Sequence, residues 1–292
     1  MDQKTWLKKN GVSLKGKTVA ITGATGGLGK EICRGVLFLG GSLLLLNRSQ
    51  EKTEVLKSSL LREFPEAEIS FLALDLQNMD SVQAACLALK ARPPQILLHN
   101  AGIYDVPRHP CSTGLDNIFQ VNFASPYYLT CQLLPELRKQ HGRVVVVGSI
   151  AHTYAKTDPA DPDFHTRSQC HLAYGNSKRW LMYAFSELFR EEKDVEFSIG
   201  HPGITLTNIS DHYPPGLFPL VRPFLRLFFM KNETACRGIL YGICHGLGSD
   251  HWCGPRYFSV WGSPRVSSLS SCSFSERREI SEGARILYEQ ML

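Results

Sequence analysis

The 292-residue sequence predicts an α/β fold, a doubly wound parallel sheet in a single domain with helices on both faces. Short apolar runs recur along the chain, and strands that are apolar without interruption are typical of a parallel sheet buried on both faces. Segments long enough for a helix separate these runs, for example GLGKEICRGVLFLG and SSLLREF. The runs expected to form strands are, in order, KTVAIT, SLLLLN, EISFLAL, QILLH, RVVVVG, VEFSIG and RYFSVW.

The composition is that of an ordinary globular protein, with 43% hydrophobic and 20% charged residues. No apolar run approaches the ~20 residues needed to span a bilayer, and the N-terminal segment lacks the apolar core of a signal peptide, so we expect a cytoplasmic protein that is not secreted. Nine cysteines are scattered without a CxxC pair, and no His cluster has metal-ligand spacing, so reduced thiols and no metal are expected. The net charge of +5 is spread along the chain, which fits an anionic cofactor or a membrane surface and argues against nucleic-acid binding.

The first expected strand leads directly into a glycine-rich turn, TGATGGLGKEI. Its glycines allow backbone N–H groups to approach phosphates closely, and the following helix directs its positive end to the same place. A phosphate-binding P-loop is excluded, because Ala24 stands where its first glycine is required and Glu31 stands where Ser or Thr should follow the lysine. The turn therefore predicts a Rossmann-type dinucleotide site. Its glycines are Gly23, Gly26, Gly27 and Gly29.

The second expected strand ends in Asn47 and Arg48, where an Asp or Glu would hold the 2′-hydroxyl of NAD. A guanidinium suits a 2′-phosphate instead, through forked, charge-assisted hydrogen bonds. We therefore expect NADP(H) to be preferred, with NAD(H) as the alternative. A solvated loop arginine is the competing interpretation of Arg48.

The segment HLAYGNSKRW places Tyr174 four positions before Lys178 on an expected helix, so both side chains share one face. A cation beside a phenol favours the phenolate and lowers the pKa of the phenol. The pair could therefore transfer a proton at neutral pH. An ordinary helix surface is the alternative, because the spacing alone is common.

Together these motifs resemble the short-chain dehydrogenase/reductase family, from about residue 17 to 261. TGATGGLG resembles the family's TGxxxGxG turn, HNAG its NNAG motif, YGNSK its active-site Tyr and Lys, and HPGITLT the stretch at the nicotinamide end. SIAH after Ser149, HPG and the final strand and helix resemble the retinol dehydrogenase-like branch. His99 departs from the family pattern, and Pro126 is expected to kink the helix that follows Asn122.

The resemblance implies the fold, the cofactor and the roles of single residues. Tyr174 would be the acid or base, Lys178 would hold the ribose and lower the pKa of the phenol, Ser149 would hydrogen-bond the substrate oxygen, and Asn122 would position a water beside Lys178. The cofactor-binding residues it implies are Gly23, Thr25, Gly27, Leu28, Gly29, Asn47, Arg48, Asp75, Leu76, Asn100, Ala101, Gly102, Tyr174, Lys178, Pro202, Gly203, Thr205 and Thr207.

The resemblance also divides the single domain, residues 1–292, into a core from about 15 to 262, a substrate lid over 203–232, and a C-terminal loop and helix over 263–292. Within the lid, residues 217–230 are rich in Leu and Phe and carry Arg222 and Arg226. They are interpreted equally well as the wall of a lipophilic pocket or as an amphipathic face on a membrane.

Either interpretation of this segment suits an apolar alcohol or carbonyl substrate of the retinoid, steroid or fatty aldehyde class. Two other functions stay open, a nucleotide-sugar epimerase or dehydratase, because TGATGGLG also fits TGxxGxxG, and a non-enzymatic NADP(H)-binding regulator. The complete catalytic set argues against the regulator. A homo-oligomer is compatible with the sequence.

Overall fold

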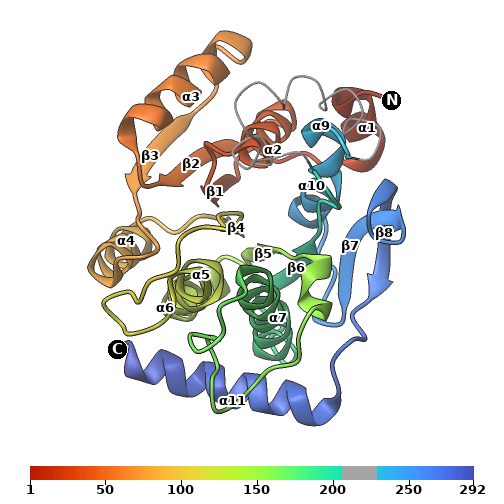
Figure 1. The fold of residues 1–292 in the computed structure, drawn as a ribbon. Helices are drawn as coiled ribbons and strands as arrows, with labels where there is room; N and C mark the ends of the chain where they lie inside the picture. Colours follow the sequence, from red (N-terminus) through yellow and green to blue (C-terminus); the bar gives the residue numbers. More distant parts are fainter. Residues whose placement is uncertain (206–228) are drawn as a thin grey trace, which may run out of the picture.

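The computed structural model describes residues 1–205 and 229–292, which form one eight-stranded sheet with helices on both faces (Figure 1). The strand order is β3-β2-β1-β4-β5-β6-β7-β8, and every neighbouring pair is parallel except β7 and β8. This order confirms the doubly wound parallel sheet. The strands are β1 (Thr18–Thr22), β2 (Ser42–Asn47), β3 (Ile69–Ala73), β4 (Ile96–His99), β5 (Arg143–Val147), β6 (Glu196–Gly200), β7 (His251–Tyr257) and β8 (Trp261–Ser268).

Two apolar clusters, one on each face of the sheet, hold the helices in place. One cluster joins α1, α2, α3 and α10 to the sheet, and the other joins α4, α6, α7 and α11. None of the described helices is long and apolar enough to cross a membrane. The helices are α1 (Gln3–Asn10), α2 (Gly27–Phe38), α3 (Gln50–Glu63), α4 (Met79–Ala91), α5 (Asn117–Phe119), α6 (Ser125–Lys139), α7 (Cys170–Leu188), α9 (Asn232–Ala235), α10 (Arg237–Cys244) and α11 (Phe274–Gln290).

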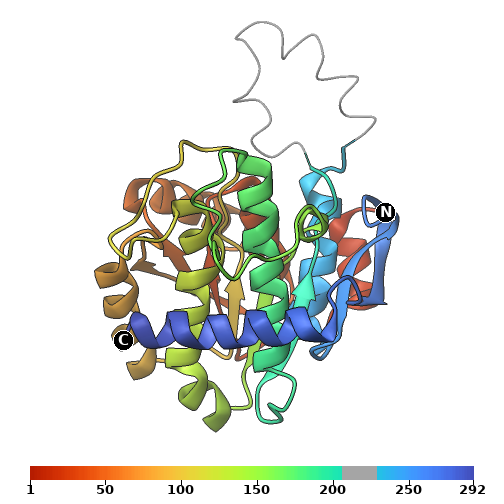
Figure 2. The ribbon, with the colours of Figure 1, turned by 60° about the horizontal axis from the view of Figure 1, so that its bottom comes forward.

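The C-terminal part differs from the sequence expectation. RYFSVW was expected as one strand, but residues 258–260 form the turn of a β7–β8 hairpin, and Phe258 and Ser259 have positive φ there. The Ser-rich stretch expected as a loop forms strand β8 in its first part, so the sheet extends to Ser268. The last helix, α11, is present and lies across α6 and α7 (Figure 2).

Candidate active site

A cavity of about 460 Å³ opens beyond the carboxyl ends of β1, β2, β3 and β4, where ligands bind in doubly wound sheets. The glycine turn forms one of its walls. A Cβ added at Gly23 would lie 2.8 Å from the Cα of Ala101, and one at Gly29 would lie 2.5 Å from the carbonyl oxygen of Gly23. The backbone segments approach so closely that these two positions accept only glycine.

The cavity has the features that a dinucleotide requires. Gly26 is the N-cap of α2 and has no side chain to bond the backbone N–H groups of the first turn of the helix. Those N–H groups are therefore available to a phosphate. Every predicted cofactor-binding residue before Tyr174 lines this cavity. These residues are Gly23, Thr25, Gly27, Leu28, Gly29, Asn47, Arg48, Asp75, Leu76, Asn100, Ala101 and Gly102.

Two asparagines on the cavity wall bond to the glycine turn. The Asn47 side chain accepts a hydrogen bond from the N–H of Ala24 at 2.9 Å. The Asn100 side chain donates to the carbonyl oxygens of Thr22 and Gly23, both at 3.0 Å. Both amides therefore hold the backbone of the glycine turn in place. They would act on a cofactor indirectly, through the position of this backbone.

Two cations stand at the β2 end of the cavity. Arg48 follows β2 directly, Lys52 lies in the first turn of α3, and both side chains are exposed. Ser49 caps α3 by accepting a hydrogen bond from the Lys52 N–H at 3.2 Å. Sequence reasoning missed Lys52, although the Ser cap three residues before it could have indicated its place.

Tyr174 and Ser149 meet where β5 ends and α7 begins. Ser149 follows β5 and caps a 3₁₀ turn (Ile150–Thr153), and its hydroxyl hydrogen-bonds the Tyr174 phenol. Burial raises the pKa of Tyr174 to about 12, and the bond from Ser149 opposes the rise. The expected lowering of this pKa by Lys178 is not found in this structure, where desolvation of the phenol is the largest cause of the shift.

Lys178 lies one turn further along α7 and is buried. Its ammonium donates to the Val147 carbonyl at 2.9 Å and stands 5.9 Å from the centre of the Tyr174 ring. Burial lowers the pKa of Lys178 to about 8. A Cβ added at Gly102 would lie 3.5 Å from the Lys178 Nζ, so the ammonium lies directly behind a wall residue of the cavity.

Asn122 lies in a π-helical turn (Gln120–Ala124) that leads into α6. Its side chain accepts from the Ile103 N–H at 2.8 Å and donates to the Ile103 carbonyl and the Ser177 hydroxyl, both at 3.0 Å. The amide is fully used in joining the loop after β4 to α7. Pro126, four residues on, has no N–H with which to bond the Asn122 carbonyl, and the irregular turn agrees with the expected distortion.

The HPG stretch follows β6 and packs against the β7–β8 turn. Gly203 has φ of +76°, and a Cβ there would lie 2.5 Å from the Val260 carbonyl oxygen. Pro202 and Thr205 flank it, and they do not line the glycine-turn cavity. Thr207, most of the expected lid and most of residues 217–230 lie outside the described residues.

Sequence reasoning missed two aromatic residues beside Tyr174. The Tyr104 ring meets the Tyr174 ring edge-on at 4.9 Å, and a Cβ at Gly175 would lie 3.0 Å from the Cβ of Tyr154. Both rings are 51% exposed. Tyr104 and Tyr154 thus give an exposed aromatic patch near Tyr174. Their positions follow from two loop conformations, which no local sequence signal predicts.

Sequence reasoning also assigned no contact to His201. Its ring is buried, with Nδ1 3.2 Å from the Gly148 carbonyl oxygen and Nε2 2.8 Å from that of Ser259. Burial lowers the pKa of His201 to about 4. His201 therefore connects the hairpin turn to the backbone just before Ser149.

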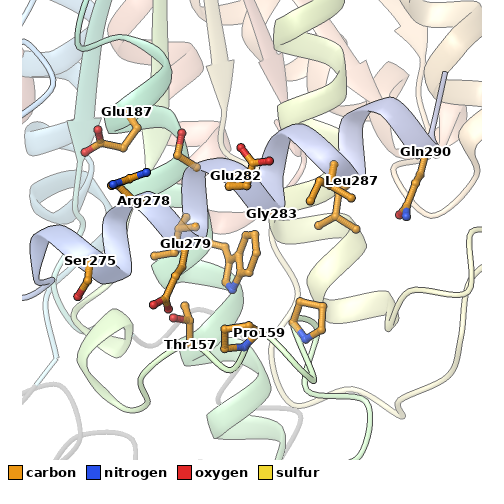
Figure 3. Close-up of a pocket in the computed structure, with 15 residues that line it drawn as sticks. Thr157, Pro159, Glu187, Ser275, Arg278, Glu279, Glu282, Gly283, Leu287 and Gln290 are labelled. Atoms are coloured by element: carbon orange, nitrogen blue, oxygen red, sulfur yellow. The ribbon is translucent and has the colours of Figure 1, made fainter.

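A separate hollow of about 860 Å³ lies along α11 (Figure 3). Residues from α11, α7 and the loop before α7 line it, including Thr157, Glu187 and Leu287. None of its lining residues belongs to the predicted site, and none of them is Tyr174, Ser149 or Lys178. These three residues do not line the glycine-turn cavity either, but Lys178 lies against its wall residue Gly102, so the cofactor is assigned to that cavity.

Known proteins share this sequence pattern and this fold. The family model for short chain dehydrogenases matches residues 17–215. The chain is 31% identical over 240 residues to the chloroplastic short-chain dehydrogenase TIC 32 A of Brassica napus, covering 76% of this chain and 73% of that protein. It is 30% identical over 250 residues to retinol dehydrogenase 14 of Mus musculus, covering 79% of this chain and 74% of that protein.

A crystal structure of an uncharacterised protein from Mycobacterium paratuberculosis matches the fold with a TM-score of 0.75 at 25% identity, over 97% of this chain and 96% of that chain. The family model covers more than half of the chain. The similarity to a retinol dehydrogenase agrees with the branch that SIAH and HPG indicated. The protein therefore belongs to the short-chain dehydrogenase/reductase family, in its retinol dehydrogenase-like branch.

Proposed function

We propose that this oxidoreductase is an NADPH-dependent reductase of apolar carbonyl compounds, with Tyr174 as the proton donor. The observation that carries the proposal is the position of the Tyr174 phenol, bonded to Ser149 and one helical turn from Lys178, whose ammonium lies behind Gly102 on the wall of the glycine-turn cavity. Because the pKa of Tyr174 is about 12, the phenol keeps its proton at neutral pH. A protonated phenol is the form that reduction of a carbonyl requires.

When bound in the cavity, NADPH supplies the hydride, and the chain's own residues handle the charge that develops on the substrate oxygen. Ser149 and Tyr174 both present hydroxyl groups, so the oxygen can accept two hydrogen bonds before it takes the Tyr174 proton. The phenolate left behind is a stronger base than the Lys178 amine, whose pKa is about 8. The order of the two pKa values therefore favours return of a proton from the Lys178 side.

Asn122 supports this proton return through its backbone. Its side-chain amide is fully bonded, so a water beside Lys178 would be held by the main-chain carbonyl. Pro126 supplies no N–H to that carbonyl. The role expected for Asn122 is thus kept, with the carbonyl oxygen in place of the amide.

The preference for NADPH is proposed from the two cations at the β2 end of the cavity. Arg48 offers the planar fork that suits a phosphate, and Lys52 adds a second charge from the start of α3. The described residues of the cavity wall include one carboxylate, Asp75, whose Oδ1 accepts from the Gln77 N–H at 3.0 Å. Asp75 follows β3 and not β2, so it does not occupy the position at the end of β2 where a carboxylate would hold the 2′-hydroxyl of NAD.

An apolar substrate is proposed from the exposed aromatic patch of Tyr104 and Tyr154 and from the Leu- and Phe-rich composition of residues 217–230. A flat, conjugated or long-chain carbonyl compound would cover these rings and bury apolar surface. Retinol dehydrogenase 14 is named for a substrate of this chemical class, which favours the same proposal for this chain.

The test is single-turnover reduction of a panel of apolar aldehydes and ketones by the protein premixed with NADPH. Tyr174→Phe keeps the ring and removes the proton, so the rate should fall by about 10²–10⁴-fold while NADPH affinity, measured by fluorescence, is unchanged. Tyr104→Phe is the matched control, since it removes a hydroxyl from the neighbouring ring and should leave the rate within about threefold. A Tyr174→Phe protein that reduces a good substrate at the wild-type rate would overturn the assignment.

A further inference from the structure

A cluster of two carboxylates and an imidazole lies in the loop between Thr153 and α7, outside the site described above. Asp161 and Asp163 are buried, at 5% and 3% exposure, while the His165 ring reaches the surface. His165 Nδ1 lies 2.8 Å from Asp163 Oδ1 and 3.0 Å from Asp161 Oδ1. One ligand atom from each residue therefore falls within 4.8 Å of the other two.

Asp161 is the unusual member, because its Oδ1 is inaccessible to solvent and accepts no hydrogen bond. Its other oxygen accepts the Thr166 hydroxyl, so the carboxylate is held with Oδ1 directed at His165. Asp163 is held in the same way, since its Oδ2 accepts from the Asp116 N–H at 2.8 Å. A buried carboxylate oxygen without a donor is costly, and each carboxylate has one oxygen that faces the imidazole.

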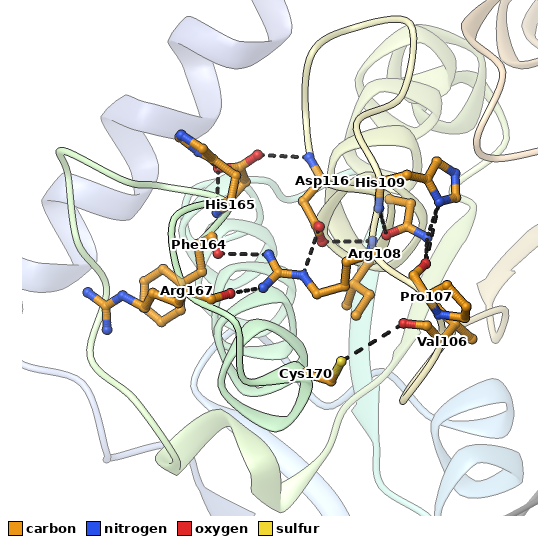
Figure 4. A network of polar contacts seen from close by, with 12 residues as sticks. Val106, Pro107, Arg108, His109, Asp116, Phe164, His165, Arg167 and Cys170 are labelled. Carbon is orange, nitrogen blue, oxygen red and sulfur yellow. Dashed lines mark hydrogen bonds and ion pairs between the residues drawn. The ribbon is translucent and has the colours of Figure 1, made fainter.

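The surrounding cations are committed to other groups (Figure 4). Arg108 pairs with Asp116 at 2.9 Å and donates to the carbonyls of Phe164 and Arg167. Arg167 pairs with Asp158 at 2.8 Å and lies only within 3.9 Å of Asp161. Apart from His165 itself, no cation among the described residues bonds directly to these two carboxylates, so a bound ion would add a positive charge between them.

We propose that Asp161, Asp163 and His165 bind a divalent first-row transition-metal ion such as Mn²⁺ or Zn²⁺. Two ligand atoms bound to one ion at about 2.1 Å, with a right angle between the bonds, lie about 3 Å apart. The distances from His165 Nδ1 to Asp161 Oδ1 and to Asp163 Oδ1 match this value. One imidazole with two carboxylates suits this class of ion better than Ca²⁺ or Mg²⁺, which prefer oxygen alone. Water would complete the coordination at the exposed His165 side.

The D-x-D-x-H spacing in DPDFH carries this site. No metal was expected because the chain has no CxxC pair and no His cluster, and a site with mixed ligands shows neither pattern. The site connects two loops that lead to the catalytic residues. The Asn176 side chain, two residues after Tyr174, donates to the Pro162 carbonyl at 2.8 Å, and Asp163 bonds to Asp116 in the loop after β4. A bound ion would therefore fix both loops to the start of α7.

Mn²⁺ is the probe that tests the site, because the nine thiols of the chain are soft ligands that select other metals. Electron paramagnetic resonance of free Mn²⁺ should give one bound ion per chain. Asp161→Asn keeps the shape of the side chain. Asp161→Asn and His165→Gln should each weaken Mn²⁺ binding by about 10–100-fold or more. His141→Gln is the matched control, since His141 faces a single exposed carboxylate, Asp194, at 4.0 Å.

A second measurement does not depend on how the variants fold. In the wild-type protein, substoichiometric Mn²⁺ should broaden the imidazole proton signals of His165 before those of any other histidine. No Mn²⁺ binding at about 1 mM, equal binding in the variants and wild type, or broadening centred elsewhere would overturn the proposal. A raised pKa of His165 in a protein that does not bind Mn²⁺ would also overturn the proposal. The hydrogen bond to Asp163 and the charges of both carboxylates would then stabilise only the protonated imidazole.

Discussion

A bidentate ion pair joins α11 to α7, in addition to the apolar cluster that packs the two helices together. Arg179 Nε and Nη2 donate to the two oxygens of Glu276, both at 2.6 Å. The Arg179 side chain is only 4% exposed, and Arg179 directly follows Lys178. Glu276 also accepts from the Thr157 N–H at 3.1 Å, so one carboxylate holds the helix and the loop after Ser149.

Glu276→Gln should destabilise the protein by about 2–3 kcal/mol. Removing one partner of a buried pair costs about 3–5 kcal/mol, but glutamine keeps one acceptor, and Arg179 keeps the carbonyls of His152 and Ser271, both at 2.9 Å. With an unfolding entropy of about 2.1 cal/mol/K per residue over 292 residues, the loss lowers Tm by about 3–5 °C. The effect should be visible at pH 7 by thermal unfolding followed by circular dichroism.

The pH dependence gives an independent readout of the same pair. Burial raises the pKa of Glu276, but the hydrogen bonds and charge of Arg179, together with the hydrogen bonds from the Thr157 N–H and Cys272, hold the pKa at about 2, below the ordinary value of 4.5. The carboxylate therefore contributes stability above pH 4.5 that is lost as pH falls towards 2. This part of the acid unfolding profile should be absent in Glu276→Gln.

Glu279→Gln is the matched control, an exposed glutamate one turn along the same helix. It should leave Tm and the acid profile unchanged. The reasoning fails if Glu276→Gln unfolds within about 1 °C of both the wild type and this control.

Two further predictions concern the cofactor and the buried lysine. Arg48→Ser and Lys52→Ser should each weaken NADPH by about 1.5–3 kcal/mol and leave NADH unchanged in fluorescence titrations; equal losses for both cofactors would contradict the 2′-phosphate assignment. Because the pKa of Lys178 is about 8 against 10.5 ordinarily, the unfolded state binds more protons between these pH values, and the free energy of unfolding should rise with pH across them by up to about 3 kcal/mol. Urea unfolding at both pH values should find this rise in the wild type and not in Lys178→Met.

The strands of the parallel part of the sheet were predictable because most are short runs dominated by apolar residues. β5, for example, is buried over its whole length. The last two strands were not predictable in this way, because Gly254, Pro255 and Pro264 interrupt the apolar pattern and β8 is mostly exposed. Pro255 lies opposite Pro264 in the antiparallel pair, and such prolines fit only where no ladder hydrogen bond is needed. A pattern search for buried strands therefore merges the hairpin into one segment.

The cavity lining was predictable because glycines and strand ends are local features. The hydrogen-bond partners of the side chains were not predictable, because these partners are distant in sequence. Asn122, for example, bonds to Ser177 of α7, 55 residues away, with its amide.

The same limit explains the wrong sign predicted for the pKa of Tyr174. The four-residue spacing shows that a cation is near, but the balance between that charge and desolvation is set by how deeply both groups are buried. Here burial moves the two groups in opposite directions, raising the pKa of Tyr174 to about 12 and lowering that of Lys178 to about 8. Each group is thereby held closer to its neutral form, which supports the proposed transfer of a proton from Tyr174 to a carbonyl oxygen.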